Sequence, residues 1–242
     1  MIIGISGPAG AGKDTAAELL VKNHGFGRIG LADGLKRICK DVFSFSDEQL
    51  WGPSSQRNAQ DKRYPRNHSF RYGTCTCCGM VLYKEGVESS VCYLTPRYAL
   101  QQLGTEWGRG CYDDLWIEEA IRTAQYIIND RSMVYSAFVG IHDLTGTCSA
   151  SFMPWRSCYC AVKGVVFSDI RFRNEMEQVK KAGGKLIRLK RDSSLSGTAS
   201  LHQSEVEMKE IGDDEFDYVI QNNDTTLEQL ELEVSKAYTA LC

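Results

Sequence analysis

The stretch Gly7-Pro-Ala-Gly-Ala-Gly12-Lys13-Asp14-Thr15 decides the fold, because it has the spacing of a P-loop: a glycine, four residues, then Gly-Lys. Its glycines allow backbone conformations that turn successive N–H groups toward one point. The apolar run before it, residues 2–6, predicts a strand. The residues from Lys13 to about Asn23 predict a helix whose positive end faces the loop. A strand, a glycine loop and a helix in this order form a cradle for phosphate groups.

The loop also predicts which residues contact a nucleotide. Lys13 would reach the β- and γ-phosphates as a mobile charge. Asp14 departs from the usual pattern, which has a Ser or Thr that ligates Mg²⁺. It could hold the metal directly or through water, or it could cap the helix while Thr15 contacts a phosphate. The residues predicted to bind ATP here are Gly7, Gly10, Ala11, Gly12, Lys13, Asp14 and Thr15.

Beyond the loop, predicted strands alternate with predicted helices. The later strands are expected at 27–32, 164–168, 185–190 and 216–221. The later helices are expected directly after residue 32, at 97–103, from 113 to about 129, at 172–182, near Ser204 and from 225 onward. This order and continuous apolar runs such as Val165-Val-Phe predict an α/β fold, a P-loop NTPase-type parallel sheet flanked by helices. We expect one P-loop domain over 1–242 with lid-like and Cys-rich irregular insertions at about 53–95 and 132–161.

The bulk composition excludes several classes of protein. A chain of 242 residues is long enough to bury a full core, and a formal net charge of −3 gives no strong nucleic-acid signal. No apolar run reaches membrane-spanning length, and the first residues do not predict a signal peptide. We therefore expect a cytoplasmic protein without a membrane partner.

Ten cysteines are many for such a protein. Because a disulfide framework is not expected without export, the close spacings are read as metal ligands. Cys75 and Cys78 form a Cys-x₂-Cys pair followed by a glycine, as in a zinc knuckle. Cys92, the Cys158/Cys160 pair, or a histidine such as His68 or His142 could complete a structural Zn²⁺ site. Free reduced thiols are the alternative.

A second group of candidates follows the strand at 164–168. Asp169 comes directly after this apolar run. In P-loop proteins, the carboxylate that orients Mg²⁺ follows an apolar strand in the same way. Arg171 would project from the carboxyl end of the strand, where ligands bind in open α/β sheets. The alternatives are a helix cap for Asp169 and a surface ion pair for Arg171.

Five segments, taken in order, resemble the bacteriophage deoxynucleoside monophosphate kinases and, more loosely, the wider nucleoside monophosphate kinase group. The resemblance covers about residues 1–50, 95–130 and 164–235, and leaves out the Cys-rich stretches. The segments are Gly12-Lys-Asp-Thr15, Ala32-Asp-Gly-Leu-Lys36, Leu103-Gly-Thr-Glu-Trp-Gly-Arg109, Ser168-Asp-Ile-Arg-Phe-Arg-Asn-Glu175 and His202-Gln-Ser-Glu205.

The resemblance implies an enzyme that uses ATP and Mg²⁺ to phosphorylate (deoxy)nucleoside monophosphates to diphosphates. It implies that Arg191 opens a lid over ATP and that Asn222 to Thr226 form a turn near the adenine, for which a capped turn is an equal alternative. The implied catalytic residues are Lys13, Asp169, Arg171 and Arg191. The implied substrate-binding residues are Lys36, Arg97, Arg109 and Arg171. The partners would be small-molecule nucleotides, with a homodimer left open, and a phage-encoded chain would act in the host cytoplasm.

Other functions stay open on the sequence alone. One is a kinase of another small acceptor, or of a modified base in DNA. Another is a nucleotide-binding zinc module without catalysis. The sequence also leaves open which bases are accepted and whether deoxyribose is required.

Overall fold

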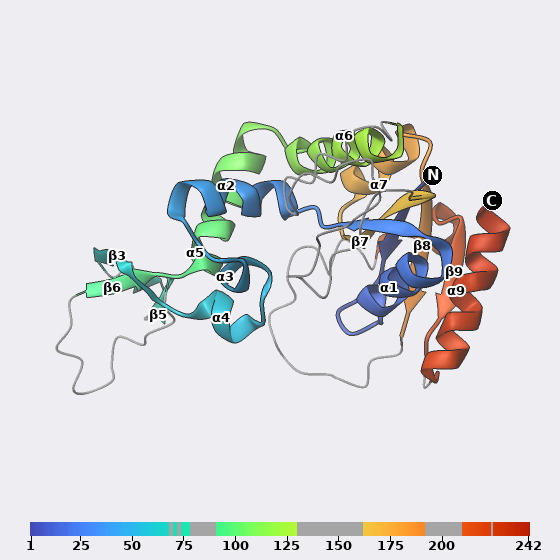
Figure 1. Cartoon of the computed structure of the whole chain (residues 1–242), viewed down its shortest axis with the longest axis horizontal. Coiled ribbons are helices and arrows are strands. Elements are labelled where there is room, and N and C mark those ends of the chain that lie inside the picture. The colour runs from blue at the N-terminus through green and yellow to red at the C-terminus, as the bar shows by residue number, and fades with distance from the viewer. Residues whose placement is uncertain (68–69, 72–73, 78–90, 130–161, 192–209, 224) are drawn as a thin grey trace, which may run out of the picture. The chain divides into compact units, whose positions relative to one another are not determined.

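The computed structural model describes residues 1–67, 70–71, 74–77, 91–129, 162–191, 210–223 and 225–242 (Figure 1). The chain has two compact units: Met1–Leu31 with Ile117–Cys242, and Ala32–Trp116. We call the first the sheet unit and the second the inserted unit. A single functional domain over 1–242 stays a prediction. Within the described ranges, no helix has the length and apolar character needed to cross a membrane.

The sheet unit is built on five parallel strands, which confirms the predicted α/β class. The strands are β1 (Ile2–Ser6), β2 (Phe26–Ile29), β7 (Gly164–Ile170), β8 (Lys185–Lys190) and β9 (Tyr218–Gln221). Their order is β2-β7-β1-β8-β9, and every neighbouring pair is parallel. Strand β1 therefore lies between β7 and β8, so the carboxyl ends of these three strands meet at one edge, where open α/β sheets bind ligands.

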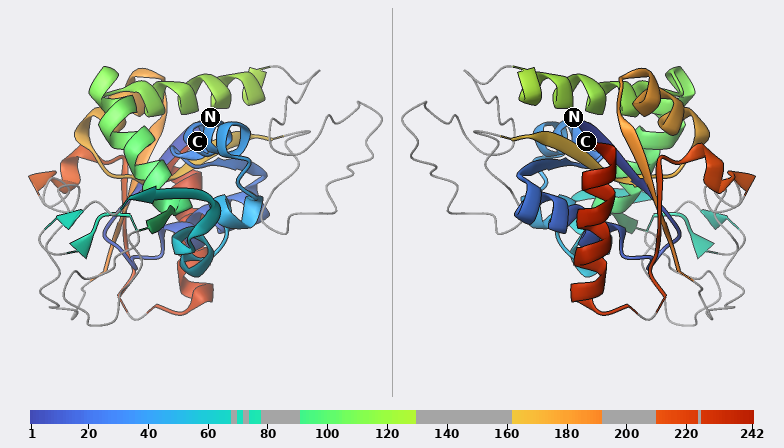
Figure 2. Two further views of the ribbon diagram at one scale, coloured as in Figure 1. Left: turned by 90° about the vertical axis from the view of Figure 1, so that its left-hand side faces the viewer. Right: turned by 90° about the vertical axis from the view of Figure 1, so that its right-hand side faces the viewer.

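Helices cover both faces of this sheet (Figures 1 and 2). Ile3 and Ile5 of β1 pack with α1 (Lys13–His24) and α9 (Leu227–Leu241). Ile2 packs on the other face with α6 (Leu115–Asn129) and α7 (Arg173–Lys181). Successive residues of a strand point to opposite faces, so a strand buried on both faces is a continuous apolar run, as the sequence predicted.

The inserted unit has its own small core around Leu35, Phe45 and Trp116. Its elements are α2 (Asp33–Phe43), α3 (Asp47–Trp51), α4 (Ser54–Asn58), β3 (Asp61–Asn67), β4 (Phe70–Arg71), β5 (Thr74–Cys75), β6 (Val91–Leu94), α5 (Pro96–Gln101) and the π-helical segment η1 (Gln102–Arg109). The sequence places Leu35, Ile38, Cys39 and Val42 on one apolar face of α2, and only half of that face is buried. Leu35 and Cys39 are buried, but Ile38 is 38% exposed and Val42 67% exposed.

The prediction of an irregular stretch at 53–95 is wrong for its described part. This part holds α4 and two antiparallel strand pairs, β3 with β6 and β4 with β5. Pro65 does not end β3, because the register shifts between Asp61 and Pro65 and such irregularities tolerate proline. The other predicted insertion, 132–161, lies outside the described residues.

Candidate active site

The loop between β1 and α1 is closely packed by backbone and side chains. Gly7 has φ +152°, and a Cβ there would lie 2.3 Å from the carbonyl oxygen of Leu189. Gly12 has φ +93°, and a Cβ there would lie 2.7 Å from Nδ2 of Asn222. A side chain at either position would strain the backbone and displace its neighbour. The loop thus has the tight glycine-dependent geometry that the sequence predicted for a phosphate cradle.

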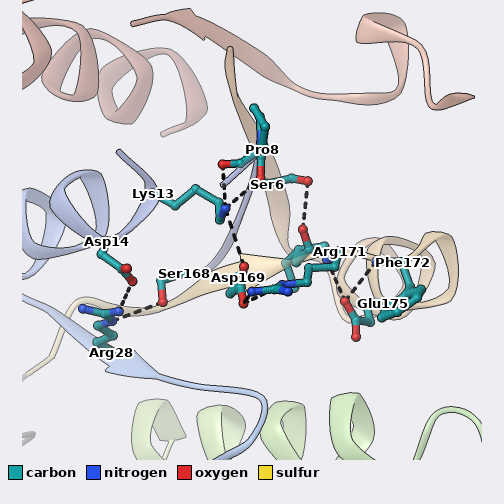
Figure 3. Close-up of polar contacts among 12 residues, drawn as sticks. Ser6, Pro8, Lys13, Asp14, Arg28, Ser168, Asp169, Arg171, Phe172 and Glu175 are labelled. Atoms are coloured by element: carbon teal, nitrogen blue, oxygen red, sulfur yellow. Dashed lines mark hydrogen bonds and ion pairs between the residues drawn. The ribbon is translucent and has the colours of Figure 1, made fainter. Parts of the chain in front are cut away.

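Lys13 folds back over this loop. Its Nζ donates hydrogen bonds to the carbonyl oxygens of Gly7 at 2.7 Å and Pro8 at 3.0 Å. It also lies 3.7 Å from Oδ1 of Asp169, and its side chain is only 12% exposed. Burial lowers the pKa of Lys13, and the nearby carboxylate of Asp169 opposes that shift. The structure therefore brings two of the predicted catalytic residues together (Figure 3).

Asp169 uses its two carboxylate oxygens differently. Oδ2 accepts from Nε of Arg171 at 2.7 Å and lies 2.6 Å from a second guanidinium nitrogen of the same residue. Oδ1 is buried and has no hydrogen-bond partner among the described residues. A buried carboxylate oxygen without a partner favours a ligand at that point. Carboxylate oxygens are ligands that Mg²⁺ prefers, so the residues here fit a magnesium ion or its bound water.

Arg171 is held in place by a residue to which the sequence assigned no role. Oε2 of Glu175 accepts from the backbone N–H of Arg171 at 2.7 Å and of Phe172 at 3.1 Å. Glu175 is 4% exposed, and it satisfies N–H groups at the start of α7. A glutamate three residues after a helix N-cap is the sequence signal that could have identified this role.

Two further residues support the loop. NH1 of Arg191 donates to the carbonyl oxygen of Gly10 at 3.1 Å, so this predicted ATP-binding residue lies against the cradle. Nδ2 of Asn222 donates to the carbonyl oxygen of Ala11 at 2.7 Å in a buried position. The resemblance placed Asn222 only in a turn near the adenine. The predicted lid beyond Arg191, with His202 and Glu205, lies outside the described residues.

The carboxylate of Asp14 contacts Arg28, a residue that the sequence did not single out. The Arg28 guanidinium, on β2, donates to Asp14 and through Nε to Oγ of Ser168 at 3.2 Å. Asp14 is the second residue of α1, and the N-cap position belongs to Gly12. A role for Asp14 as the N-cap residue is therefore wrong, whereas its contact with a metal stays untested.

The remaining substrate-binding candidates belong to the inserted unit and lie on three separate elements. Nζ of Lys36 on α2 lies 3.5 Å from Oδ1 of Asp33 and 5.3 Å from the ring centroid of Trp51. Arg97 is exposed in the first turn of α5, and Arg109 is the last residue of η1. Their predicted contacts with an acceptor phosphate stay predictions.

The zinc prediction also concerns the inserted unit. Cys75 and Cys92 are buried, with their Sγ atoms 3.9 Å apart, and the thiol of Cys77 donates to the carbonyl oxygen of Tyr93 at 3.2 Å. Cys78 lies outside the described residues. Among those described, no three or more His, Cys, Asp or Glu side chains form a group that could hold a metal. A zinc ion bound by Cys75 and Cys78 stays a prediction.

The fold and this site define the chain as a P-loop NTPase-type α/β protein. No family model matches it. A protein of Acanthamoeba polyphaga mimivirus named "Putative deoxynucleotide monophosphate kinase" is 30% identical over 227 residues, which cover 93% of this chain and 90% of the relative. The chain belongs to the deoxynucleotide monophosphate kinase family.

Proposed function

We propose that this protein transfers a phosphoryl group from ATP to a deoxynucleoside monophosphate and forms the diphosphate. One observation carries the proposal. Nζ of Lys13 lies 3.7 Å from Oδ1 of Asp169 beside a glycine loop, and this buried oxygen makes no hydrogen bond within the described residues. A cation that can move to a phosphate and a carboxylate that can hold a magnesium ion are the two groups that phosphoryl transfer at a P-loop needs. The mimivirus relative carries the name of such a kinase.

On the donor side, the loop and two cations would bind the ATP phosphates. Loop N–H groups and the N-terminus of α1 would surround the β-phosphate. Lys13 would exchange its hydrogen bonds to the carbonyl oxygens of Gly7 and Pro8 for hydrogen bonds to phosphate oxygens. Arg191 would likewise exchange its hydrogen bond to the carbonyl oxygen of Gly10 for one to a phosphate oxygen. Mg²⁺, when bound by Asp169 and Thr15, would neutralise charge on the phosphate oxygens.

On the acceptor side, guanidinium groups would hold the monophosphate. Arg171 is fixed by Asp169 and Glu175 and is half exposed, so it can present N–H groups to a dianion. Arg97, Arg109 and Lys36 are the further candidates. The acceptor phosphate is already ionised at neutral pH, so no side chain has to act as nucleophile or base. The protein would act by positioning the two phosphates and by neutralising charge between them.

An ADP-release screen tests the proposal. The protein is given ATP, Mg²⁺ and each of the common ribo- and deoxyribonucleoside monophosphates, with free nucleosides and duplex DNA as further acceptors. We expect ADP release with at least one deoxynucleoside monophosphate and little with its nucleoside. The same screen with Lys13→Ala controls for a contaminating kinase. Release with duplex DNA alone would favour a kinase of bases in DNA, and ATP binding without release would favour a module without catalysis.

A further inference from the structure

Arg28 joins the phosphate loop to the strand that carries Asp169. It lies on β2, and its guanidinium contacts Asp14 and lies 3.7 Å from Glu18, both on α1. Its Nε donates to Oγ of Ser168, the residue directly before Asp169 on β7. Figure 3 shows Arg28 between Asp14 and Ser168 and apart from Lys13. The Arg28 side chain is 32% exposed, but those of Asp14 and Glu18 are 76% and 71% exposed, so water screens much of these contacts.

An acid at position 14 raises an electrostatic problem for a phosphate site. Like charges that lie close together repel each other, and water weakens that repulsion without removing it. A carboxylate one residue after Lys13 would therefore repel the donor phosphates unless a cation neutralised it. Glu18, one helical turn further on, adds a second negative charge on the same side of α1. Arg28 is the cation that contacts both carboxylates.

A guanidinium against Asp14 also disfavours a metal ion there. A divalent cation bound directly by this carboxylate would lie close to a fixed positive charge and compete with it for the same oxygen. Asp169 is also paired with a guanidinium, that of Arg171 at 2.6 Å, but its buried Oδ1 makes no hydrogen bond within the described residues and lies 3.7 Å from Nζ of Lys13. The two acids therefore differ in their surroundings: Asp14 is 76% exposed and paired with Arg28, whereas Asp169 keeps a buried oxygen toward Lys13.

We propose that Arg28 is a positioning residue that holds the Asp14 carboxylate away from the donor phosphates, so that Asp14 is the counter-ion of Arg28 and not a direct ligand of Mg²⁺. This inference rests on the proposed function, because it assumes that ATP binds at the loop. It deepens that function by separating the roles of the two acids beside Lys13.

A charge-matched set of variants tests this inference through ATP affinity rather than turnover. ATP binding is measured by calorimetry in EDTA and in Mg²⁺ for the wild type, Arg28→Gln, Asp14→Asn and the double variant. In EDTA we expect Arg28→Gln to weaken binding by about tenfold, which corresponds to about 1.4 kcal/mol. The double variant should return to within about threefold of the wild type, since the uncompensated carboxylate is gone. Asp14→Asn alone should keep the gain in affinity that Mg²⁺ gives.

Two controls separate positioning from other causes. Arg122→Gln on α6 makes the same change of net charge. Arg122 is exposed and pairs with Glu118 on the same helix, so this variant should leave ATP affinity unchanged. Arg28→Lys should weaken ATP binding in EDTA less than Arg28→Gln. A Mg²⁺-dependent gain that disappears in Asp14→Asn would overturn the proposal, as would a double variant as weak as Arg28→Gln.

The remaining outcomes are also decisive. If Arg28→Gln does not fold, Asp14→Asn and Arg28→Lys still report on the metal and on the charge. A loss that the double variant does not relieve, together with a lowered melting temperature, would assign Arg28 a structural role only. A wild-type protein that binds ATP in neither condition would instead overturn the proposed function, and this inference with it.

Discussion

The sheet unit and the inserted unit arrange their charged side chains in different ways. In the sheet unit, Lys13, Arg28 and Arg171 come from different elements and meet carboxylates at one edge of the sheet. In the inserted unit, Lys36 is paired within its own helix, and Arg97 and Arg109 belong to other elements. Parallel strands carry their carboxyl ends to a common edge, whereas short helices and antiparallel pairs do not. The order of the parallel strands alone therefore brings together the residues that are proposed to bind the ATP phosphates.

The cores of the two units differ as well. Ile, Val and Leu dominate the two clusters on either side of the sheet. The inserted unit relies on aromatic residues, on buried cysteines and on a buried acid, Asp61. Hydrogen bonds from Arg63 and Gln49 hold the pKa of Asp61 well below its usual range. The stability of the inserted unit should therefore depend more strongly on acid pH than that of the sheet unit.

The largest expected effect tests the residues of the sheet unit that are proposed to bind ATP. Lys13→Ala should lower phosphoryl transfer by at least about a hundredfold, on the scale of losing one preorganised electrostatic contact. The fold should survive, and steady-state kinetics with a thermal melt measure both. Lys22→Ala, an exposed lysine in the last turn of the same helix, is the matched control. Near-normal turnover in folded Lys13→Ala would end the P-loop kinase interpretation.

The second prediction concerns the two arginines assigned to the acceptor phosphate. Arg171→Ala in the sheet unit and Arg109→Ala in the inserted unit should each raise the KM for the monophosphate by about tenfold or more, since a hydrogen bond to a charged group is worth about 1.5–3 kcal/mol. The KM for ATP should change far less. Separate titrations of the two substrates decide this. A mutant that loses ATP affinity and keeps its acceptor KM would show that its residue belongs to the donor side.

The third prediction concerns acid and the inserted unit. Because the pKa of Asp61 is lowered in the folded state, its contribution to stability is present above the ordinary carboxyl pKa and is lost as the pH falls below about 4. Asp61→Asn should lower the free energy of unfolding by about 1–2 kcal/mol at pH 7 and by less at pH 3, where part of the contribution of the carboxylate is already lost. Urea unfolding at both pH values measures this, with exposed Asp41→Asn as control. Equal losses at pH 7 and pH 3 would contradict it.

The smallest expected effect on phosphoryl transfer comes from the cysteines. If the chain holds a structural zinc ion, protein purified without added metal should contain about one zinc per chain. Cys75→Ser/Cys78→Ser should lose that zinc and lower the melting temperature by about 2–4 °C for each kcal/mol lost. Elemental analysis and a thermal melt provide the test, with the exposed Cys242→Ser as control. Metal-free protein with full activity and unchanged melting would disprove the zinc site.

The sequence predicted those parts of the structure that depend on local patterns. The bounds of β1 and β8 agree with the predicted strands: β1 is an apolar run that ends at Gly7, and β8 carries Leu186, Ile187 and Leu189 directly after Gly183 and Gly184. The helix from Lys13 ends at Gly25, whose φ of +70° suits a glycine cap. The P-loop motif identifies Lys13, and its place at the end of a strand identifies Asp169. The sequence therefore predicted that the two residues act together.

The roles of Arg28 and Asn222 could not be predicted from the sequence in the same way. Arg28 contacts Ser168 because β2 pairs with β7, and Asn222 contacts Ala11 because of where β9 ends. Strand order cannot be read from alternating strands and helices, so residues whose role depends on it carry no local signal. The strand β3 was missed because Pro65 normally ends a strand, and only a register shift accommodates it here.

The position of β1 in the sheet has a consequence for how the protein is made on the ribosome. This strand is synthesised before the other strands of the sheet, and both of its neighbours, β7 and β8, begin only at Gly164 and Lys185. The carbonyl group of Ala11 receives its hydrogen bond only when residue 222 has left the exit tunnel. Until those segments have been made, a nascent chain carries an apolar strand without its neighbours and a loop without one of its contacts, so the ability to hold a nucleotide should arise only after residue 222 has emerged.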